Sequence, residues 1–197
     1  MKLSPARRHD ALMMALALTV IAVDQLTKHW IVQYFRVPGE RAPIQLVGPF
    51  LTLDYIQNRG VAFSLLEGQS VLFFFIFIAI GVISWLYWRV RDTGSLLLKL
   101  TFGLVLGGAA GNLIDRVRNA NQVVDFIHFQ IPNVFNFAVF NVADSAISLG
   151  VIALAYLLWR TAPAEGAAPA DPAVPARRAP GASATAPRVR NPRARAR

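Results

Sequence analysis

The amino-acid sequence predicts an α-helical membrane protein, a bundle of four transmembrane helices, and three observations lead to this fold class. The 197 residues are 55% hydrophobic and only 16% charged, and their mean hydropathy of +0.44 is too high for an ordinary soluble domain. Four segments are long and apolar enough for helices that cross a hydrocarbon core about 30 Å thick. Basic residues are concentrated before the first helix, between the second and the third, and after the fourth, which is typical of such a bundle.

The four predicted transmembrane helices lie at residues 11–32, 71–88, 96–114 and 142–159. The first is interrupted by Asp24 and Lys28. The second and the fourth both end in tryptophan, which favours the membrane interface. Lys99 lies near one end of the third, where its long side chain could extend to the headgroups.

Basic residues orient this bundle. Three precede the first helix, Arg89 and Arg91 lie between the second and the third, and the C-terminal segment is rich in arginine. The positive-inside rule therefore predicts that both termini are cytoplasmic and that the connections 33–70 and 115–141 face the periplasm. No small-residue cleavage site follows the first apolar stretch, which predicts an uncleaved anchor.

The two outer connections differ in character. Residues 33–70 contain partly alternating apolar positions between glycine and proline, which predicts a small β-sheet on the membrane surface. Residues 115–141 are unusually apolar and aromatic for a loop, and we expect them to lie in the membrane interface. Residues 161–197, rich in Ala, Pro and Arg, are predicted to be a disordered cytoplasmic tail that follows a single membrane-embedded domain at 1–160.

The charge and the residue inventory exclude several classes of function. The formal net charge is +9, but the tail supplies +5 of it through seven arginines against two acidic residues, so the charge does not indicate a nucleic-acid partner. The absence of cysteine excludes disulfides, thiolate metal sites and a cysteine nucleophile. No serine–histidine or serine–lysine arrangement surrounds Ser145. Asp125, His128 and Asp144 are conceivable metal ligands. The chain has few histidines and no cysteine to complete such a site, so we predict no metal and no cofactor.

Two aspartates on the predicted outer side are the candidate catalytic residues. Asp125 lies in the apolar outer connection, and Asp144 lies in the first turn of the fourth helix. Two carboxyl groups held together at low dielectric share a proton, and such a pair supplies a base that activates water and an acid that protonates a leaving nitrogen. Helix capping by Asp144, next to the equally suitable cap Asn141, explains its position as well, and the sequence leaves both interpretations open.

The third predicted helix carries a stripe of glycines and then a polar end. Gly103, Gly107 and Gly111 recur every four residues, which predicts the close approach of another helix. Asn112 and Arg116 follow on one face, because they are four residues apart. That face could present an amide and a guanidinium group to a peptide backbone or a lipid headgroup.

The other charged residues near the outer side are predicted to form pairs. Asp24 and Lys28 have the favourable i,i+4 order for an ion pair inside the bundle. Alternatively, Lys28 could meet a lipid phosphate. Asp115 could pair with Arg116 or Arg118.

Five motifs in a fixed order carry a resemblance to a known family. They are DQLTK, NRGVAF, GGAAGNLIDR, VVDF and FNVADS, and they fall within roughly residues 10–160. With these motifs the chain resembles the bacterial lipoprotein signal peptidases, the type II signal peptidases, which are intramembrane aspartic proteases. The tail lies outside the resemblance, and nothing about it follows from the family.

The resemblance implies roles for individual residues. The catalytic pair falls on Asp125 and Asp144. The positions that line the family's active site match Asn58, Gly60, Asn112, Arg116 and Asn141. Asp24 and Lys28 match the first motif and are expected to have a supporting role.

The resemblance also implies a fold and a reaction. It implies a small β-cradle and an interfacial helix on the periplasmic side, in agreement with the two outer connections. The expected activity is removal of the signal peptide from prolipoproteins, just before the cysteine that carries a diacylglyceryl group, by a monomer in the bacterial inner membrane. Its partners would be these precursors and membrane lipids. From the residues alone, a proton-coupled transporter and a lipoprotein-binding scaffold remain the alternative classes.

Overall fold

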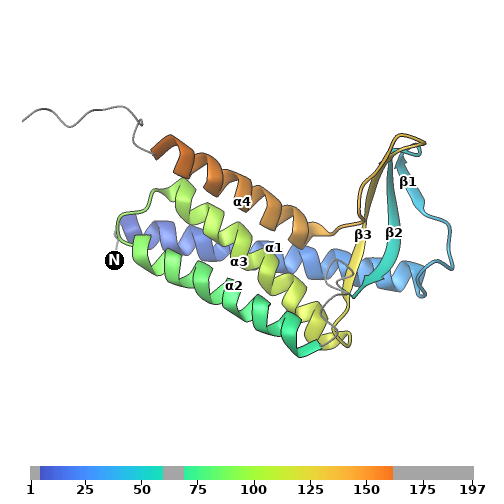
Figure 1. Cartoon of the computed structure of the whole chain (residues 1–197), viewed down its shortest axis with the longest axis horizontal. Coiled ribbons are helices and arrows are strands. Elements are labelled where there is room, and N and C mark those ends of the chain that lie inside the picture. The colour runs from blue at the N-terminus through green and yellow to red at the C-terminus, as the bar shows by residue number, and fades with distance from the viewer. Residues whose placement is uncertain (1–4, 60–68, 162–197) are drawn as a thin grey trace, which may run out of the picture. The chain divides into compact units, whose positions relative to one another are not determined.

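A computed structural model describes residues 5–59 and 69–161 of the chain (Figure 1). The helices in these ranges are α1 (Pro5–Phe35), α2 (Gln69–Val90), α3 (Leu96–Arg118) and α4 (Val142–Thr161). Each begins and ends within a few residues of a predicted apolar segment, except that α1 starts earlier. The predictions for Gly60 and for the tail beyond residue 161 lie outside the described residues.

Three of the described helices are long and apolar enough to cross a membrane. They are Pro5–Phe35, Leu96–Arg118 and Val142–Arg160. In α2 the described apolar stretch is Ile76–Val90. The structure therefore gives a helical membrane protein, while the fourth span stays a prediction.

An antiparallel sheet stands at the end of the bundle where α1 and α3 finish and α4 begins (Figure 1). Its strands follow the order β1 (Ile44–Val47), β2 (Leu51–Asn58), β3 (Val123–Ile131) and β4 (Phe135–Asn136). The predicted sheet in the first outer connection is thus completed by strands from the second. In the second outer connection the structure forms β3 and β4, because β-branched and aromatic residues favour strands. The interfacial helix that the resemblance implied stays a prediction.

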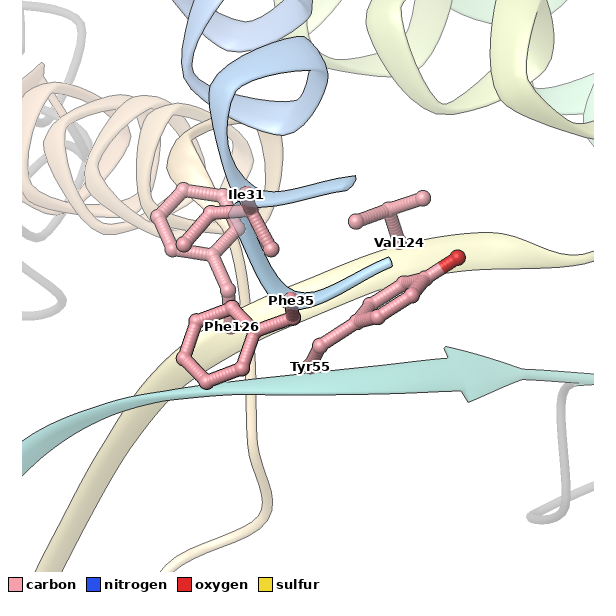
Figure 2. Packing of buried hydrophobic residues seen from close by; sticks show 5 residues of the cluster. All are labelled: Ile31, Phe35, Tyr55, Val124 and Phe126. Carbon is pink, nitrogen blue, oxygen red and sulfur yellow. The ribbon is translucent and has the colours of Figure 1, made fainter. Parts of the chain in front are cut away.

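The sheet is joined to the bundle by an apolar core at the end of α1. Ile31 and Phe35 of α1 pack against Tyr55 of β2 and against Val124 and Phe126 of β3, as Figure 2 shows. All five side chains are nearly inaccessible. This core fixes the beginning of β3, and with it Asp125, relative to α1.

Glycines let α3 lie against its neighbours at backbone distance. A β-carbon added at Gly103 or Gly107 would lie 2.8 Å from the carbonyl oxygen of Met13 or Ala17 in α1. Gly108 meets the backbone of α4 in the same way. The close helix approach predicted from the glycine stripe is confirmed, and it brings the polar end of α3 beside both α1 and α4.

Candidate active site

The chain segment before α4 is held against β3. The backbone N–H of Phe140 donates to the carbonyl oxygen of Ile127 (3.0 Å), and the N–H of Ile127 donates back to Phe140 (2.7 Å). This bridge places the next residue, Asn141, beside Asp125. Helix α4 then begins at Val142, so the N-terminus of α4 faces the start of β3.

Asn141 contacts both candidate catalytic carboxyl groups. Its Nδ2 donates to Oδ1 of Asp125 at 2.7 Å, and its backbone N–H donates to Oδ2 of Asp144 at 3.2 Å. In return, Oδ1 of Asn141 accepts from the backbone N–H of Asp144 at 2.9 Å. Asn141 is fully buried. One side chain thus links a strand residue and a helix residue from separate motifs.

Asp125 lies in β3 and is only 2% exposed. Its Oδ2 accepts from Nδ2 of Asn58 at 2.9 Å, because Asn58 ends β2 on the neighbouring strand. The pKa of Asp125 is raised to about 6, chiefly by burial and also by the charge of Asp144, while the hydrogen bonds from Asn58 and Asn141 and the charge of Lys28 partly oppose the rise. Asp125 therefore exchanges its proton close to neutral pH.

Asp144 lies in the first turn of α4 and is half-buried. Its Oδ1 accepts from Nδ2 of Asn112 at 2.7 Å, and its Oδ2 accepts from the Asn141 backbone. The reciprocal bonds with Asn141 form a capping box, so the capping interpretation of Asp144 is confirmed. Capping occupies only some of the lone pairs of the carboxylate, so further acceptor sites remain on it.

A buried lysine supports this cluster from α1. Nζ of Lys28 lies 2.8 Å from Asp24 and 3.0 Å from Asp115, and it donates to Oδ1 of Asn112 at 2.9 Å. Lys28 is 3% exposed, so the predicted ion pair with Asp24 is present and a lipid phosphate has no access to it. Because Oδ1 of Asn112 faces Lys28, its Nδ2 is directed to Asp144.

Asp24 and Asp115 also hold the backbone of the site. Oδ1 of Asp24 accepts from the N–H of Ala143 in the first turn of α4, at 2.9 Å. Oδ2 of Asp115 accepts from the N–H of Val124, the residue before Asp125, at 3.0 Å. Each ion-pair partner of Lys28 therefore fixes a chain segment that carries a candidate catalytic aspartate.

Sequence reasoning missed Asp115 and Gln25 as parts of this network. Asp115 pairs with Lys28 instead of Arg116 or Arg118, and Nε2 of Gln25 donates to Oδ1 of Asp115 at 2.9 Å. The available signal was the position of both residues within the motifs. Their partners lie far away in the sequence, so no local spacing could identify them.

Arg116 lies on the same face of α3 as Asn112. Its Nη1 donates to the carbonyl oxygen of Asn112 at 3.3 Å, and the charges of Asp144 and Asp125 act on it. Its buried Nε has no hydrogen-bond partner among the described residues. The described residues thus leave one donor of this guanidinium group unsatisfied.

The alternative chemistries find little support in the geometry. Oγ of Ser145 donates to the carbonyl oxygen of Asn141 at 2.9 Å, so this hydroxyl group is engaged in the helix cap. Nε2 of His128 bonds to Oδ1 of Asn136 at 2.7 Å. Within residues 5–59 and 69–161, no three His, Cys, Asp or Glu residues form a group that could hold a metal ion. Gly60 is the one predicted site residue that lies outside these ranges.

Comparisons with known proteins match the domain that carries this site. The family described as "Signal peptidase (SPase) II" matches residues 16–160. A lipoprotein signal peptidase from Bartonella tribocorum is 43% identical over 150 residues, which are 75% of this chain and 86% of that protein. Those from Moorella thermoacetica and Streptococcus agalactiae are 40% and 36% identical and cover 78% and 74% of this chain and 97% and 90% of their own lengths.

A solved structure described as a bacterial membrane enzyme has a similar fold. It superposes with a TM-score of 0.66 at 27% identity, over 77% of this chain and 95% of that one. The sequence comparisons extend over most of this chain and of its relatives, and they agree with the resemblance carried by the five motifs. The chain therefore belongs to the signal peptidase II family.

Proposed function

We propose that this protein is an endopeptidase that removes the signal peptide from diacylglyceryl-modified prolipoproteins, with Asp125 and Asp144 as its catalytic pair. Family membership supports the activity and the class of substrate. One observation supports the pair above all others: the buried Asn141 is hydrogen-bonded to both carboxyl groups. Asn141 thereby holds the two carboxyl groups near one another, and the charge of Asp144 acts on Asp125.

The reaction begins with one carboxyl group ionised and the other protonated. The carboxylate takes a proton from a water molecule, whose oxygen attacks the scissile carbonyl carbon, while the protonated carboxyl transfers its proton to the carbonyl oxygen. A tetrahedral gem-diol forms. Its collapse breaks the C–N bond: the proton taken from water moves to the departing nitrogen, and one hydroxyl of the gem-diol returns its proton to the other carboxylate, which restores the pair. Asp125 is buried and has a raised pKa, so it is suited to holding the shared proton. Asp144 is half-buried, so it is suited to binding the water molecule.

The surrounding residues position the reacting groups. Asn58 and Asn141 hold the carboxyl group of Asp125, and Asn112 holds that of Asp144. The guanidinium group of Arg116 is proposed to bind a backbone carbonyl of the substrate. Gly60 is proposed to line the same site. Asp24 and Lys28 act through the backbone of α4 and the orientation of Asn112.

We further propose a monomeric enzyme in the bacterial inner membrane with four transmembrane helices. The apolar α2 supplies the fourth span, both termini are cytoplasmic, and the sheet forms a periplasmic β-cradle. The basic connection at Arg89 and Arg91 supports this orientation. The precursor's signal-peptide helix and lipid chains would then enter laterally from the bilayer, and the scissile bond would meet the aspartates at the outer surface.

The test is to replace each aspartate by asparagine, which keeps the volume but removes the acid–base capacity. Asp125→Asn and Asp144→Asn should each reduce cleavage of a lipid-modified precursor by about 1,000-fold or more, because each removes an essential proton-transfer group. Precursor binding should persist. The matched control is Asp92→Asn, since Asp92 is an exposed aspartate in a connection that the site does not include.

The outcomes separate the alternative classes. Cleavage that survives in either site variant contradicts the aspartate pair. Precursor binding by the wild-type protein without cleavage supports the scaffold instead. Loss of wild-type activity on addition of a chelator would indicate a metal enzyme.

A further inference from the structure

The end of the sheet farthest from the candidate active site exposes a group of large apolar side chains, here called the sheet tip. It consists of Val47, Phe50, Ile131, Val134, Phe135 and Phe137. The β1–β2 and β3–β4 turns meet there, because the N–H of Gln130 donates to the carbonyl oxygen of Phe50 at 2.9 Å. The exposed fractions run from 41% for Ile131 to 80% for Val134.

The sheet tip has no charged residue. None occurs in residues 42–53 or 126–143, which form both turns and most of the strands around them. A sheet edge that faces water is normally protected by charged side chains, and a contiguous apolar patch is normally covered. The composition therefore favours an apolar environment for the tip.

Residues at the C-terminal end of α1 indicate the level of the sheet relative to the membrane. Trp30 and Tyr34 are exposed on α1 and stacked on each other, with ring centroids 5.6 Å apart, and the guanidinium group of Arg41 lies over the Tyr34 ring. Such aromatic residues mark the membrane–water interface. Ile31 and Phe35, on the same turns of α1, pack into the sheet core. The sheet thus stands at the level of the interface.

The direction of the strands carries the tip away from the bundle. In Figure 1 the strands run across the direction of the helices, and the end with the β1–β2 turn projects beyond them. An extension sideways at interface level meets the lipids that surround the helices. The exposed apolar side chains of the tip can therefore meet the same lipids as the exposed apolar side chains of the helices.

We propose that the sheet tip inserts into the headgroup and upper acyl region of the leaflet on its side, with bilayer lipid as its partner. The inference depends on the membrane-spanning helices and not on the aspartate pair. It adds a role for β3, which carries Asp125 at one end and Ile131 at the other, about 20 Å away along the strand. Anchoring the Ile131 end of β3 in the membrane would fix the height of Asp125 relative to the membrane surface.

Site-specific labelling can test this contact, because the chain has no cysteine. A fluorophore on Val134→Cys in lipid nanodiscs should be blue-shifted and quenched by lipids that carry a nitroxide near the headgroup. The same label on Glu40→Cys, an exposed polar position in the α1–β1 connection, should be quenched much less. Water-like emission at position 134 without lipid quenching overturns the proposal. Shielding that appears only when a lipidated precursor is added also overturns it, because the partner is then the substrate.

A second measurement connects the anchor to catalysis. Val134→Asp should reduce cleavage of a bilayer-embedded precursor about tenfold, since misplacing reacting groups by about 1 Å can lower rates about 100-fold. In detergent micelles the same variant should cleave a solubilised precursor at the wild-type rate. The near-isosteric Val134→Thr is the uncharged control. Equal losses in bilayer and micelle contradict the anchoring role, whereas inactivity of Asp125→Asn leaves the labelling result unaffected.

Discussion

At the scale of single residues, Asn141 combines two roles that are usually separate. Its side-chain oxygen caps α4 by accepting from the backbone of Asp144, and its side-chain nitrogen donates to Asp125. A cap residue is chosen locally, but the contact with Asp125 depends on how the preceding segment pairs with β3. The same amide therefore contributes to helix stability and to the alignment of the proposed catalytic pair.

These two roles can be separated by substitution. Asn141→Ala should lower the free energy of unfolding by about 1–2 kcal/mol through loss of the cap. Asn141→Ser should recover most of this stability, since serine is a good cap, but its shorter side chain cannot reach Asp125. We expect both variants to lose cleavage by about 100-fold or more. Thermal unfolding and precursor cleavage measure the two effects, and full activity of Asn141→Ser would show that the contact with Asp125 is dispensable.

The raised pKa of Asp125 predicts how activity depends on pH. Below about pH 6 Asp125 is mostly protonated, and above it mostly ionised. If Asp125 is the acid of the pair, kcat/KM falls as the pH rises through this value. Asn58 donates to the ionised form, so Asn58→Ala should raise the pKa of Asp125 and move the basic limb upward by roughly one pH unit.

Gln57→Ala is the matched control for the pH profile. Gln57 is the neighbouring residue in β2 and donates to the hydroxyl oxygen of Tyr55 (2.9 Å). Its loss should leave the limb in place. A limb that moves downward in Asn58→Ala contradicts the assignment of the acid to Asp125.

At the scale of elements, residues from several helices contact the N-terminus of α4 and so form the site. The N–H of Ala143 donates to Asp24 from α1, while Asp144 is capped by Asn141 and bonded to Asn112 from α3. A helix N-terminus offers free N–H groups and a positive dipole end. It therefore stabilises negative charges that an apolar bundle would otherwise exclude.

Close helix packing around α3 gives a prediction at this scale. A β-carbon at Gly107 would lie 2.8 Å from the carbonyl oxygen of Ala17, and the backbone of α1 cannot easily yield. Gly107→Ala should therefore lower the free energy of unfolding by about 1–3 kcal/mol. Gly81→Ala in α2 is the control, because a β-carbon there meets nothing within 4 Å. It should be neutral or stabilising by up to about 1 kcal/mol. Unfolding in detergent compares them, and equal effects would contradict the packing argument.

At the scale of the whole membrane domain, two buried lysines hold the helices together near the two ends of α1. Lys28 pairs with Asp24 and Asp115 beside the sheet. At the other end, Lys99 pairs with Asp10, which also accepts from the hydroxyl group of Tyr87 in α2. Lys99 is only 1% exposed, so it is buried in an ion pair instead of extending to the headgroups as its sequence position allowed.

The two lysines should differ in their contribution to stability. Lys28→Met leaves the carboxylates of Asp24 and Asp115 buried without their cation, at a cost of about 3–5 kcal/mol. Lys99→Met should be milder, because the Asp10 side chain is 37% exposed and water can solvate it. Unfolding free energies in detergent give the comparison. A larger loss for Lys99→Met would show that solvent access does not decide the difference.

The sequence by itself determined the apolar lengths that form helices, the glycine spacing on α3 and the residues of the candidate pair, because these follow from local composition and from recognisable motifs. Tertiary structure decided which partners they meet. The pairing of β2 with β3 brings Asn58 to Asp125, and the approach of α1 to α3 brings Lys28 to Asp115. These contacts join residues far apart in the chain, and no local periodicity encodes them. Burial is likewise a property of the assembled fold, and burial is what moves the pKa of Asp125 towards neutrality.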